Sequence, residues 1–537
     1  MLSAAVPRAD DDTGHDAVAA HFDPTRAPTS ARTPAPAGRW GADLATSDVP
    51  TLAAYLVRAL TAMQEAAAGR GGPVPAGAPG AVHDRVAEAL AGEPIPERGV
   101  GAGHAIDALC GLAGWGAADP GDPRCAGHLH TPPLAMAVAA DTVAAALNQS
   151  LDSWDQAPAM TGLEAEVVGA LGALVYGSDD ASDEPAGVTS GVVTSGVVTS
   201  GGTESNLMGL LLARSAVCRR AWGVDVVRTG LPAQADRLRV YCSEAAHFST
   251  QRAAGLLGLG EERVVPVAVD AEHRLRPEAL DRAMRRQGDT YPLAVVATAG
   301  TTDAGAVDPL PAIAAVAREH GCWLHVDAAY GGGALFSRRL RPLLTGIRLA
   351  DSVALDLHKL GWQPTAAGVF LARGAAALAP LARQVAYLNP GDDEEAGYTS
   401  LLGRSLRTTR RPDVLKIAVT LRALGRQGLG AMVDHCRDLA THAAACVDAD
   451  RRLERTLPVT LTSVVFRYAA AQDADTVNAR IRRDLLAAGR AVVGRCDVAG
   501  RVWLKLTLLN PEATAADVEA LLDLVAATGA RLEEESA

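Results

Sequence analysis

Between residues 131 and 395, the chain alternates helical patterns of apolar residues with short, continuous apolar runs. These runs include RLRVYCS, LAVVATAG, CWLHVDAA, DSVALDLH and GVFLARG. Apolar runs of this length are typical of buried strands, and strands that alternate with helices predict a mostly parallel sheet with helices on both faces. We therefore predict an α/β fold with a ligand site at the carboxyl ends of its strands, where such sheets bind ligands.

The segments on either side have different patterns. Residues 1–45 include DPTRAPTSARTPAPAGR, which has almost no large apolar side chains to offset the entropy of ordering it and predicts a disordered tail. Near their start, residues 46–130 contain TLAAYLVRALTAMQ, whose spacing predicts an N-terminal helical segment. Residues 396–537 contain the strand-like TSVVFRYAA and RVWLKLTLL, with the helical DADTVNARIRRDLLAAG between them. We expect a small C-terminal α+β domain there.

Composition narrows the class of protein. The hydrophobic share of 48% and the charged share of 21% are those of a globular protein, and we expect no apolar run of the ~20 residues that a membrane span needs. The N-terminal MLSAAVPRADDDTGHDAVAA is acidic where a signal peptide is basic, and the net charge of -12 argues against nucleic acid as a partner. The eight cysteines form no CxxC pair or Cys/His cluster at metal spacing. We expect a soluble, cytoplasmic protein that binds no metal.

The sequence GVTSGVVTSGVVTSGGTESN contains GVVTS twice in tandem after a partial copy. It is too short for a solenoid, whose units are longer and more numerous. We interpret it as a short duplication before a functional loop. Whether it pairs as a strand or bulges into solvent stays open at this point.

Three motifs at predicted strand ends carry candidate chemistry. Ser200–Asn206 places glycines before a new helix, which suits a phosphate but also describes an ordinary loop with a threonine cap. Asp327 ends an apolar strand, where it could pair with a protonated ring nitrogen or simply begin a turn. Lys359 could form a Schiff base with an aldehyde cofactor if burial or positive neighbours deprotonate its amine, although most lysines are surface charges. Together the three motifs predict a site for pyridoxal 5′-phosphate (PLP).

The motifs also resemble a known family, the group II PLP-dependent decarboxylases, which includes the aromatic amino acid, glutamate and 2,4-diaminobutyrate decarboxylases. The resemblance runs from about Gly127 to Pro511 through HLHTPPL, NQSLDSWDQAPAMTGLE, TSGGTESNLMGLLLAR, SEAAHFS, TAGTTDAGAVDPL, HVDAAYGG, DLHKLGWQP, YLNP, LRTTRRPDVLK and LTLLNP. It implies the type I, aminotransferase-like PLP fold. SWDQAPAMTGLE and TTRRPDVLK are more similar to the diaminobutyrate branch than to the aromatic branch.

The resemblance implies a role for each matching residue. Lys359 would carry the cofactor covalently, Asp327 would pair with the pyridine nitrogen, and His247 would stack on one face of the ring. Tyr387 or His247 would protonate the substrate carbon, and a buried core aromatic is the alternative interpretation of Tyr387. Residues implied to contact the cofactor are Gly201, Gly202, Thr203, His247, Thr302, Asp327, Ala329, Asp356, His358 and Lys359.

The resemblance says less about the substrate. Thr131 and Trp154 are candidate substrate contacts, but the diaminobutyrate branch usually has cysteine at the position of Thr131. Asp152 and Asp155 could meet a distal ammonium, although helix capping and surface charge are simpler explanations. Pro412 replaces the family's usual aromatic after Arg410 and Arg411, so the packing of these arginines is expected to differ.

We therefore predict a homodimeric decarboxylase with a diamino acid, first L-2,4-diaminobutyrate, as its substrate. Lysine, ornithine, glutamate or an aromatic amino acid are the alternatives. An aminotransferase or lyase on the same fold is the alternative activity, and a non-catalytic binding protein is remote.

Overall fold

The computed structural model describes residues 44–177, 194–286, 288–374 and 376–536. The chain divides into two compact units, residues 1–54 and 55–537. Only residues 44–54 of the first unit are described, and they include the start of α2 (Val49–Ala68). The predicted disordered tail therefore lies almost wholly outside the described residues, and the three boundaries between the four predicted segments stay predictions.

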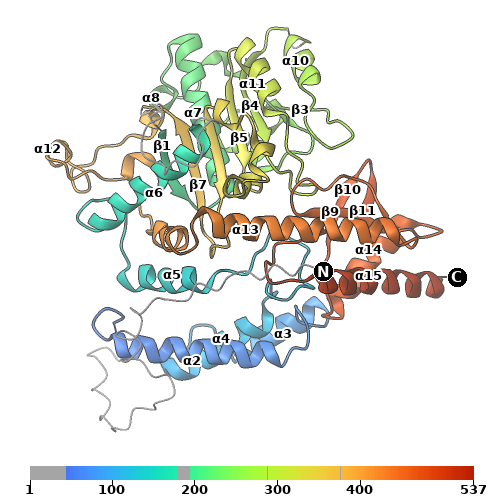
Figure 1. The fold of residues 1–537 in the computed structure, drawn as a ribbon. Coiled ribbons are helices and arrows are strands. Elements are labelled where there is room, and N and C mark those ends of the chain that lie inside the picture. The colour runs from blue at the N-terminus through green and yellow to red at the C-terminus, as the bar shows by residue number, and fades with distance from the viewer. Residues whose placement is uncertain (1–43, 178–193, 287, 375, 537) are drawn as a thin grey trace. The chain divides into compact units, whose positions relative to one another are not determined.

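The central element of the second unit is a seven-stranded sheet (Figure 1). Its strand order is β1-β7-β6-β5-β4-β2-β3, in which β7 runs antiparallel to β1 and β6 and the other neighbours are parallel. This confirms the predicted α/β fold with a mostly parallel sheet. The strands are β1 (Thr194–Thr199), β2 (Leu238–Ser243), β3 (Val264–Val267), β4 (Tyr291–Thr298), β5 (Trp323–Ala328), β6 (Ser352–Asp356) and β7 (Gly368–Arg373).

The strands are buried along most of their length because helices cover both faces of the sheet. All five residues of β6 and the last six of β4 are buried. On one side, α7 (Gly202–Trp222) packs against β5, β6 and β7. The helices before α13 are α2, α3 (Pro79–Ala89), α4 (Ala102–Gly116), α5 (Ala135–Leu147), α6 (Pro158–Tyr176), α7, α8 (Val226–Thr229), α9 (Ser249–Leu256), α10 (Pro277–Arg286), α11 (Leu310–Glu319) and α12 (Gly391–Glu395).

The C-terminal part contains a second sheet of four antiparallel strands in the order β10-β11-β9-β8. A long helix, α13 (Val414–Ala449), leads into it and packs against α5, α6 and α15 (Figure 1). Its backbone leaves helical geometry at Gly425, where φ is 59°. The remaining elements are β8 (Leu453–Arg455), β9 (Ser463–Tyr468), α14 (Ala474–Ala487), β10 (Gly494–Val498), β11 (Arg501–Thr507) and α15 (Ala515–Ser536).

The last copy of the GVVTS duplication pairs as a strand, whereas residues 187–193 lie outside the described part. β1 is an edge strand that pairs with β7. On its open edge, Val198 donates its N–H to Glu164 Oε1 (3.1 Å), and its carbonyl accepts from Arg410 (3.2 Å). Glu164 and Arg410 form a buried ion pair at 2.7 Å. Two side chains thus take the place of a neighbouring strand and fix the strand that leads into the Ser200–Asn206 loop.

Among the described residues, α6 is long and apolar enough, by length and composition, to cross a membrane. This differs from the sequence-based expectation that no such segment exists. The helix places Val167, Val168, Leu171 and Val175 in the core beside the sheet, and it carries Glu164 in the ion pair described above. Its apolar character is therefore explained by packing inside the protein.

Candidate active site

A cavity of about 380 Å³ opens at the carboxyl edge of the seven-stranded sheet. Four strands deliver residues to it from their ends: Gly201 follows β1, Thr298 ends β4, Asp327 lies near the end of β5, and Asp356 ends β6. β1 is antiparallel to β7, and β7 is antiparallel to β6, so β1 and β6 run in the same direction and end at the same edge. The cavity lies where the strand pattern predicted a ligand site.

Lys359 brings a primary amine to this cavity from the turn after β6. Its Nζ lies 2.9 Å from Asp356 Oδ2, and the side chain is 19% exposed. The partner is a carboxylate rather than one of the positive neighbours considered in the sequence analysis. The chain has only two other lysines. Lys416 is fully buried in ion pairs with Asp141 and Asp413, and Lys505 pairs with Asp303.

Asp327 is the acid at the end of β5, and it is buried with 7% of its surface exposed. Its Oδ1 accepts a hydrogen bond from the backbone N–H of Ala329 (3.1 Å), and its Oδ2 accepts one from Asn206 Nδ2 (2.7 Å). Ala329 and Thr302 also line the cavity. The predicted ring-nitrogen acid is therefore held in a fixed position against the same space as Lys359.

The Ser200–Asn206 loop forms another wall of the cavity. α7 begins at Gly202, and the first N–H groups of a helix have no partner inside the helix. A Cβ atom on Gly202 would lie 2.9 Å from Ala329 Cβ and 3.2 Å from Asp356 Oδ2, so this position has room only for glycine. Thr203 and His358 line the cavity beside it. The loop therefore presents a helix N-terminus to the cavity, which suits an anion.

His247 lines the cavity from the turn before α9. Its Nδ1 lies 2.9 Å from Ser249 Oγ. Burial lowers the pKa of the His247 imidazole, although the nearby Asp327 carboxylate acts in the opposite direction. Burial also lowers the pKa of His358, which is close to Asp356. Both rings are therefore favoured in their neutral form at neutral pH.

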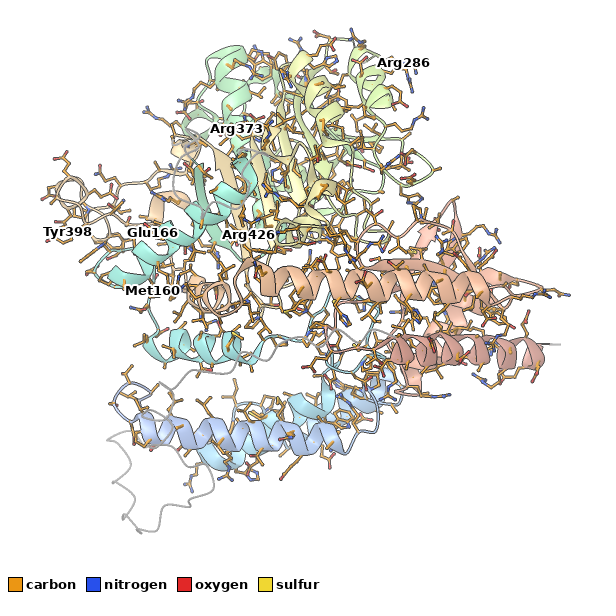
Figure 2. All side chains as sticks on the ribbon, viewed as in Figure 1. Met160, Glu166, Arg286, Arg373, Tyr398 and Arg426 are labelled. Carbon is orange, nitrogen blue, oxygen red and sulfur yellow. The ribbon has the colours of Figure 1, made fainter. Side chains whose placement is uncertain are left out.

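The structure does not bring every predicted residue to the cavity. Tyr387 is 79% exposed and does not line the cavity, which contradicts the alternative that it is a buried core aromatic. Thr131 is buried and donates to the carbonyl of His358 (3.2 Å) without lining the cavity. Trp154 packs edge-on against Tyr398, labelled in Figure 2, with ring centroids 5.0 Å apart.

The two acids near Trp154 have other partners. Asp152 is buried and accepts a hydrogen bond from Gln156 (3.1 Å), and Asp155 is exposed and bonded to Ser153. Neither lines the cavity. The exposure of Asp155 agrees with the surface-charge explanation, whereas Asp152 is buried and bonds to a side chain, so neither simpler explanation accounts for Asp152.

Sequence reasoning missed Asn206 and His325 behind the cavity. Asn206 lines the cavity, donates to Asp327, and accepts from His325 Nε2 (2.9 Å). A signal was available, because Asn206 lies three residues after Thr203 at the start of a helix and therefore shares its face. A signal was also available for His325, because it lies two residues before Asp327 on β5 and therefore points to the same face of the strand.

A cluster of three possible metal ligands, which the sequence did not predict, lies outside the cavity. Within the described ranges, His442, Cys446 and Glu519 place ligand atoms within 4.8 Å of one another. His442 Nε2 and Glu519 Oε1 are 2.8 Å apart, so a hydrogen bond accounts for their approach. This group plays no part in the site described here.

The cavity fits a polar, anionic aldehyde cofactor. Three buried polar atoms on lining residues, Thr298 Oγ1, Asp356 Oδ1 and His358 Nδ1, have no hydrogen-bond partner in the described part of the chain. Buried polar atoms of this kind usually have a partner. Together with the helix N-terminus, the strand-end acid and the amine, they form a donor and acceptor set that PLP would satisfy.

Comparison with known proteins settles the family. The sequence model described as "Pyridoxal-dependent decarboxylase conserved domain" matches residues 117–469, which is more than half of the chain. The chain belongs to this family. It is a PLP-dependent amino acid decarboxylase, as the motifs predicted.

Similar decarboxylases cover most of the chain. An L-2,4-diaminobutyrate decarboxylase from Rhizobium meliloti is 42% identical over 82% of this chain and 85% of its own length. Another from Acinetobacter baumannii is 38% identical over 77% of this chain and 81% of its own. Among solved structures, the glutamate decarboxylase domain of diaminobutyrate-pyruvate transaminase and L-2,4-diaminobutyrate decarboxylase from Vibrio parahaemolyticus has a TM-score of 0.78 at 32% identity, covering 89% of this chain and 96% of that one. These similarities confirm the type I PLP fold.

Proposed function

We propose that this decarboxylase converts L-2,4-diaminobutyrate into 1,3-diaminopropane and CO₂. The observation that carries the proposal is the pair of relatives with that printed activity, which are 42% and 38% identical over most of both lengths. The matched region includes a complete candidate PLP site with its amine, acid and helix N-terminus. The substrate is therefore proposed from similarity, and the chemistry from the cavity.

Lys359 and Asp327 are the residues proposed to hold the aldehyde and the ring nitrogen of the cofactor. When bound, PLP withdraws electrons from the substrate Cα, so that the bond to the carboxylate can break. Lys359 would hold the aldehyde covalently, because it is the lysine whose amine lies at the cavity. Asp327 would hold a proton on the ring nitrogen, since its buried carboxyl group is fixed by the N–H of Ala329 and by Asn206.

The other lining residues bind and orient the cofactor. Gly201, Gly202, Thr203 and His358, which line the cavity at the N-terminus of α7, would bind the phosphate. With PLP bound, His247 and Ala329, which both line the cavity, would pack against its ring. Thr302 and Asp356 lie beside them in the same cavity, and Asp356 holds the Lys359 amine at 2.9 Å.

The proton that replaces CO₂ on the substrate carbon comes from His247 or Tyr387. His247 is at the cavity, and its Nδ1 is occupied by Ser249, so Nε2 is the nitrogen for proton transfer. Tyr387 serves this role only if its exposed segment reaches a site, in the same subunit or in a partner.

We also propose that the enzyme is a cytoplasmic homodimer. Apolar side chains remain exposed on the single chain along α2 (Leu56, Val57, Leu60 and Met63) and along α5 (Val138, Val143 and Leu147). Exposed apolar surface of this kind favours a second copy as its cover. The eight cysteines are free, as in a reducing compartment. A mass in solution near 55.3 kDa rather than about twice that value would contradict the dimer.

A substrate panel tests the proposed activity. Purified enzyme with added PLP is offered L-2,4-diaminobutyrate, ornithine, lysine, glutamate and an aromatic amino acid, and both CO₂ and the amine are measured. We expect kcat/KM for diaminobutyrate to exceed that for ornithine by about 10- to 200-fold, because the two differ by one methylene. A keto acid product without CO₂, or a preference for another member of the panel, would overturn the assignment.

A further inference from the structure

A chain of hydrogen bonds runs behind the cavity and ends on His247. It connects, in order, Trp323, Ser352, His325, Asn206, Ser249 and His247. The successive distances are 2.9, 2.8, 2.9, 2.8 and 2.9 Å. His325 is 0% exposed and Asn206 is 2% exposed, so these groups have little access to water. In such a chain, the donor and acceptor at each contact can be worked out from the chemistry of its members.

Asp327 fixes the orientation of the Asn206 amide. A carboxylate only accepts, so the group 2.7 Å from Asp327 Oδ2 must be the Asn206 NH₂. The amide oxygen then faces His325 Nε2 at 2.9 Å. Because an amide oxygen also only accepts, His325 must carry a proton on Nε2.

Trp323 fixes the other nitrogen of His325. The indole N–H only donates, so Ser352 Oγ accepts from it at 2.9 Å. The Ser352 hydroxyl can then donate to His325 Nδ1 at 2.8 Å. Burial lowers the pKa of His325 to about 4, which agrees with a neutral ring at physiological pH. His325 therefore accepts a hydrogen bond at Nδ1 and donates one at Nε2.

The second hydrogen of the Asn206 amide determines which ring nitrogen of His247 carries the proton. It points to Ser249 Oγ at 2.8 Å, which leaves the Ser249 hydroxyl hydrogen for His247 Nδ1 at 2.9 Å. The backbone N–H of Ser249 also donates to this nitrogen at 3.3 Å. Since Nδ1 accepts both bonds, the proton of a neutral His247 lies on Nε2.

We infer that Asn206 is a positioning residue that orients the carboxyl group of Asp327 and holds the proton of a neutral His247 on Nε2. One of its amide hydrogens goes to the acid proposed to hold the ring nitrogen, and the other acts through Ser249 on the proposed proton donor. The inference rests on the proposed roles of Asp327 and His247. It adds that both groups depend on one amide, whose orientation His325 maintains.

The packing of α7 is adapted to this arrangement. Gly209 lies three residues after Asn206 on the same face of the helix. A Cβ atom at position 209 would lie 2.5 Å from His325 Nδ1. The glycine therefore leaves the space in which the imidazole ring reaches the Asn206 amide.

The test replaces Asn206 with aspartate, which keeps the shape but cannot donate to Ser249. The measurement is the ¹⁵N chemical shifts of the His247 ring in ¹⁵N-histidine-labelled protein without PLP, assigned with a His247→Gln variant. In the wild type we expect an unprotonated Nδ1 and a protonated Nε2. In Asn206→Asp we expect fewer than half of the His247 rings to have this protonation pattern. We also expect kcat of the PLP-loaded enzyme to fall about 10²-fold, with a smaller change in KM.

Two variants of His325 provide the rescue test. His325→Gln keeps an N–H donor for Asn206, whereas His325→Leu removes it. We expect the glutamine variant to retain the wild-type ring shifts of His247 and most of kcat. The leucine variant should change the His247 ring shifts and lower kcat in the same way as Asn206→Asp does.

Asn478→Asp is a matched control for burying a carboxylate in place of an amide. Asn478 is fully buried, and its Nδ2 donates to Tyr468 O (2.9 Å) and Ala474 O (2.8 Å) in the C-terminal part. We expect this variant to lose stability while the folded protein keeps the His247 shifts and kcat of the wild type.

The outcomes separate this inference from the proposed function. A wild-type His247 with its proton on Nδ1, or an Asn206→Asp variant with wild-type ring shifts, would overturn the inference even if the wild-type enzyme releases CO₂. A wild-type enzyme that fails to release CO₂ from the substrate panel would overturn the proposed function, while the ring shifts would still test the hydrogen-bond chain.

Discussion

Replacing Lys359 with alanine is expected to lower the rate of CO₂ release by at least about 10³-fold, because the covalent attachment of the cofactor is lost. No other lysine can substitute in place. Lys416 and Lys505 hold their amines in ion pairs with acids, and neither lines the cavity. CO₂ release measures the loss. Borohydride reduction of the wild type, followed by peptide mass spectrometry, is expected to find the phosphopyridoxyl group on Lys359.

Lys359→Arg is the control for loss of charge. In the wild type, Lys359 Nζ forms an ion pair with Asp356 Oδ2 at 2.9 Å. Arginine keeps a positive charge beside Asp356 but cannot form the covalent link to the cofactor. We expect this variant to fold like the wild type and to be as inactive as Lys359→Ala. A cofactor label on another lysine, or substantial turnover in either variant, would contradict the role of Lys359.

Replacing Asp327 with alanine is expected to leave PLP bound but to reduce kcat on the order of 10³-fold, since a fixed charge beside the reacting group is removed. The structure supports a separate effect on binding and turnover, because Lys359 and the first residues of α7 reach the cavity from other elements than the strand that carries Asp327. Absorbance of the bound cofactor reports binding, and CO₂ release reports turnover.

Asp351→Asn is a matched control on the same sheet. Asp351 precedes β6 and accepts the N–H of Leu324 at 2.7 Å, near the start of β5 rather than its end. We expect it to affect stability without affecting kcat. If Asp327→Ala kept most of the wild-type turnover, the acid would not serve as the partner of the ring nitrogen.

Much of the fold could be predicted because local patterns specified it. The apolar runs that predicted β2, β4, β5, β6 and β7 are buried on both faces, and such strands are recognisable from a few residues. Parallel strands end at one edge, so Asp327 and Lys359 could be expected in one cavity although they come from different strands. The prediction of a PLP site depended on this topological rule.

Other features depend on contacts between distant segments. The pairing of β1 relies on β7 along one edge and on Glu164 and Arg410 along the other, and none of these is encoded in the GVVTS repeat. α13 contains Gly425, which interrupts the helical pattern, so its full length was not predicted.

The same limit applies to the site. Motif position suggested a role for Tyr387, but exposure and distance from the cavity are properties of packing that a motif does not contain. The bond between His325 and Asn206 joins residues 119 positions apart, through the contact of α7 with β5. Polar networks of this kind become visible only when both elements are in place.

The close approach of Gly209 to His325 implies a constraint on how this protein can change during evolution. A larger residue at position 209 would collide with the imidazole, whereas loss of the imidazole would leave the Asn206 amide without its partner. A larger residue at position 209 is therefore tolerable only where the side chain at position 325 no longer occupies this space, so lineages that enlarge position 209 are expected to change position 325 first. Positions 209 and 325 should therefore covary among relatives that keep Asn206.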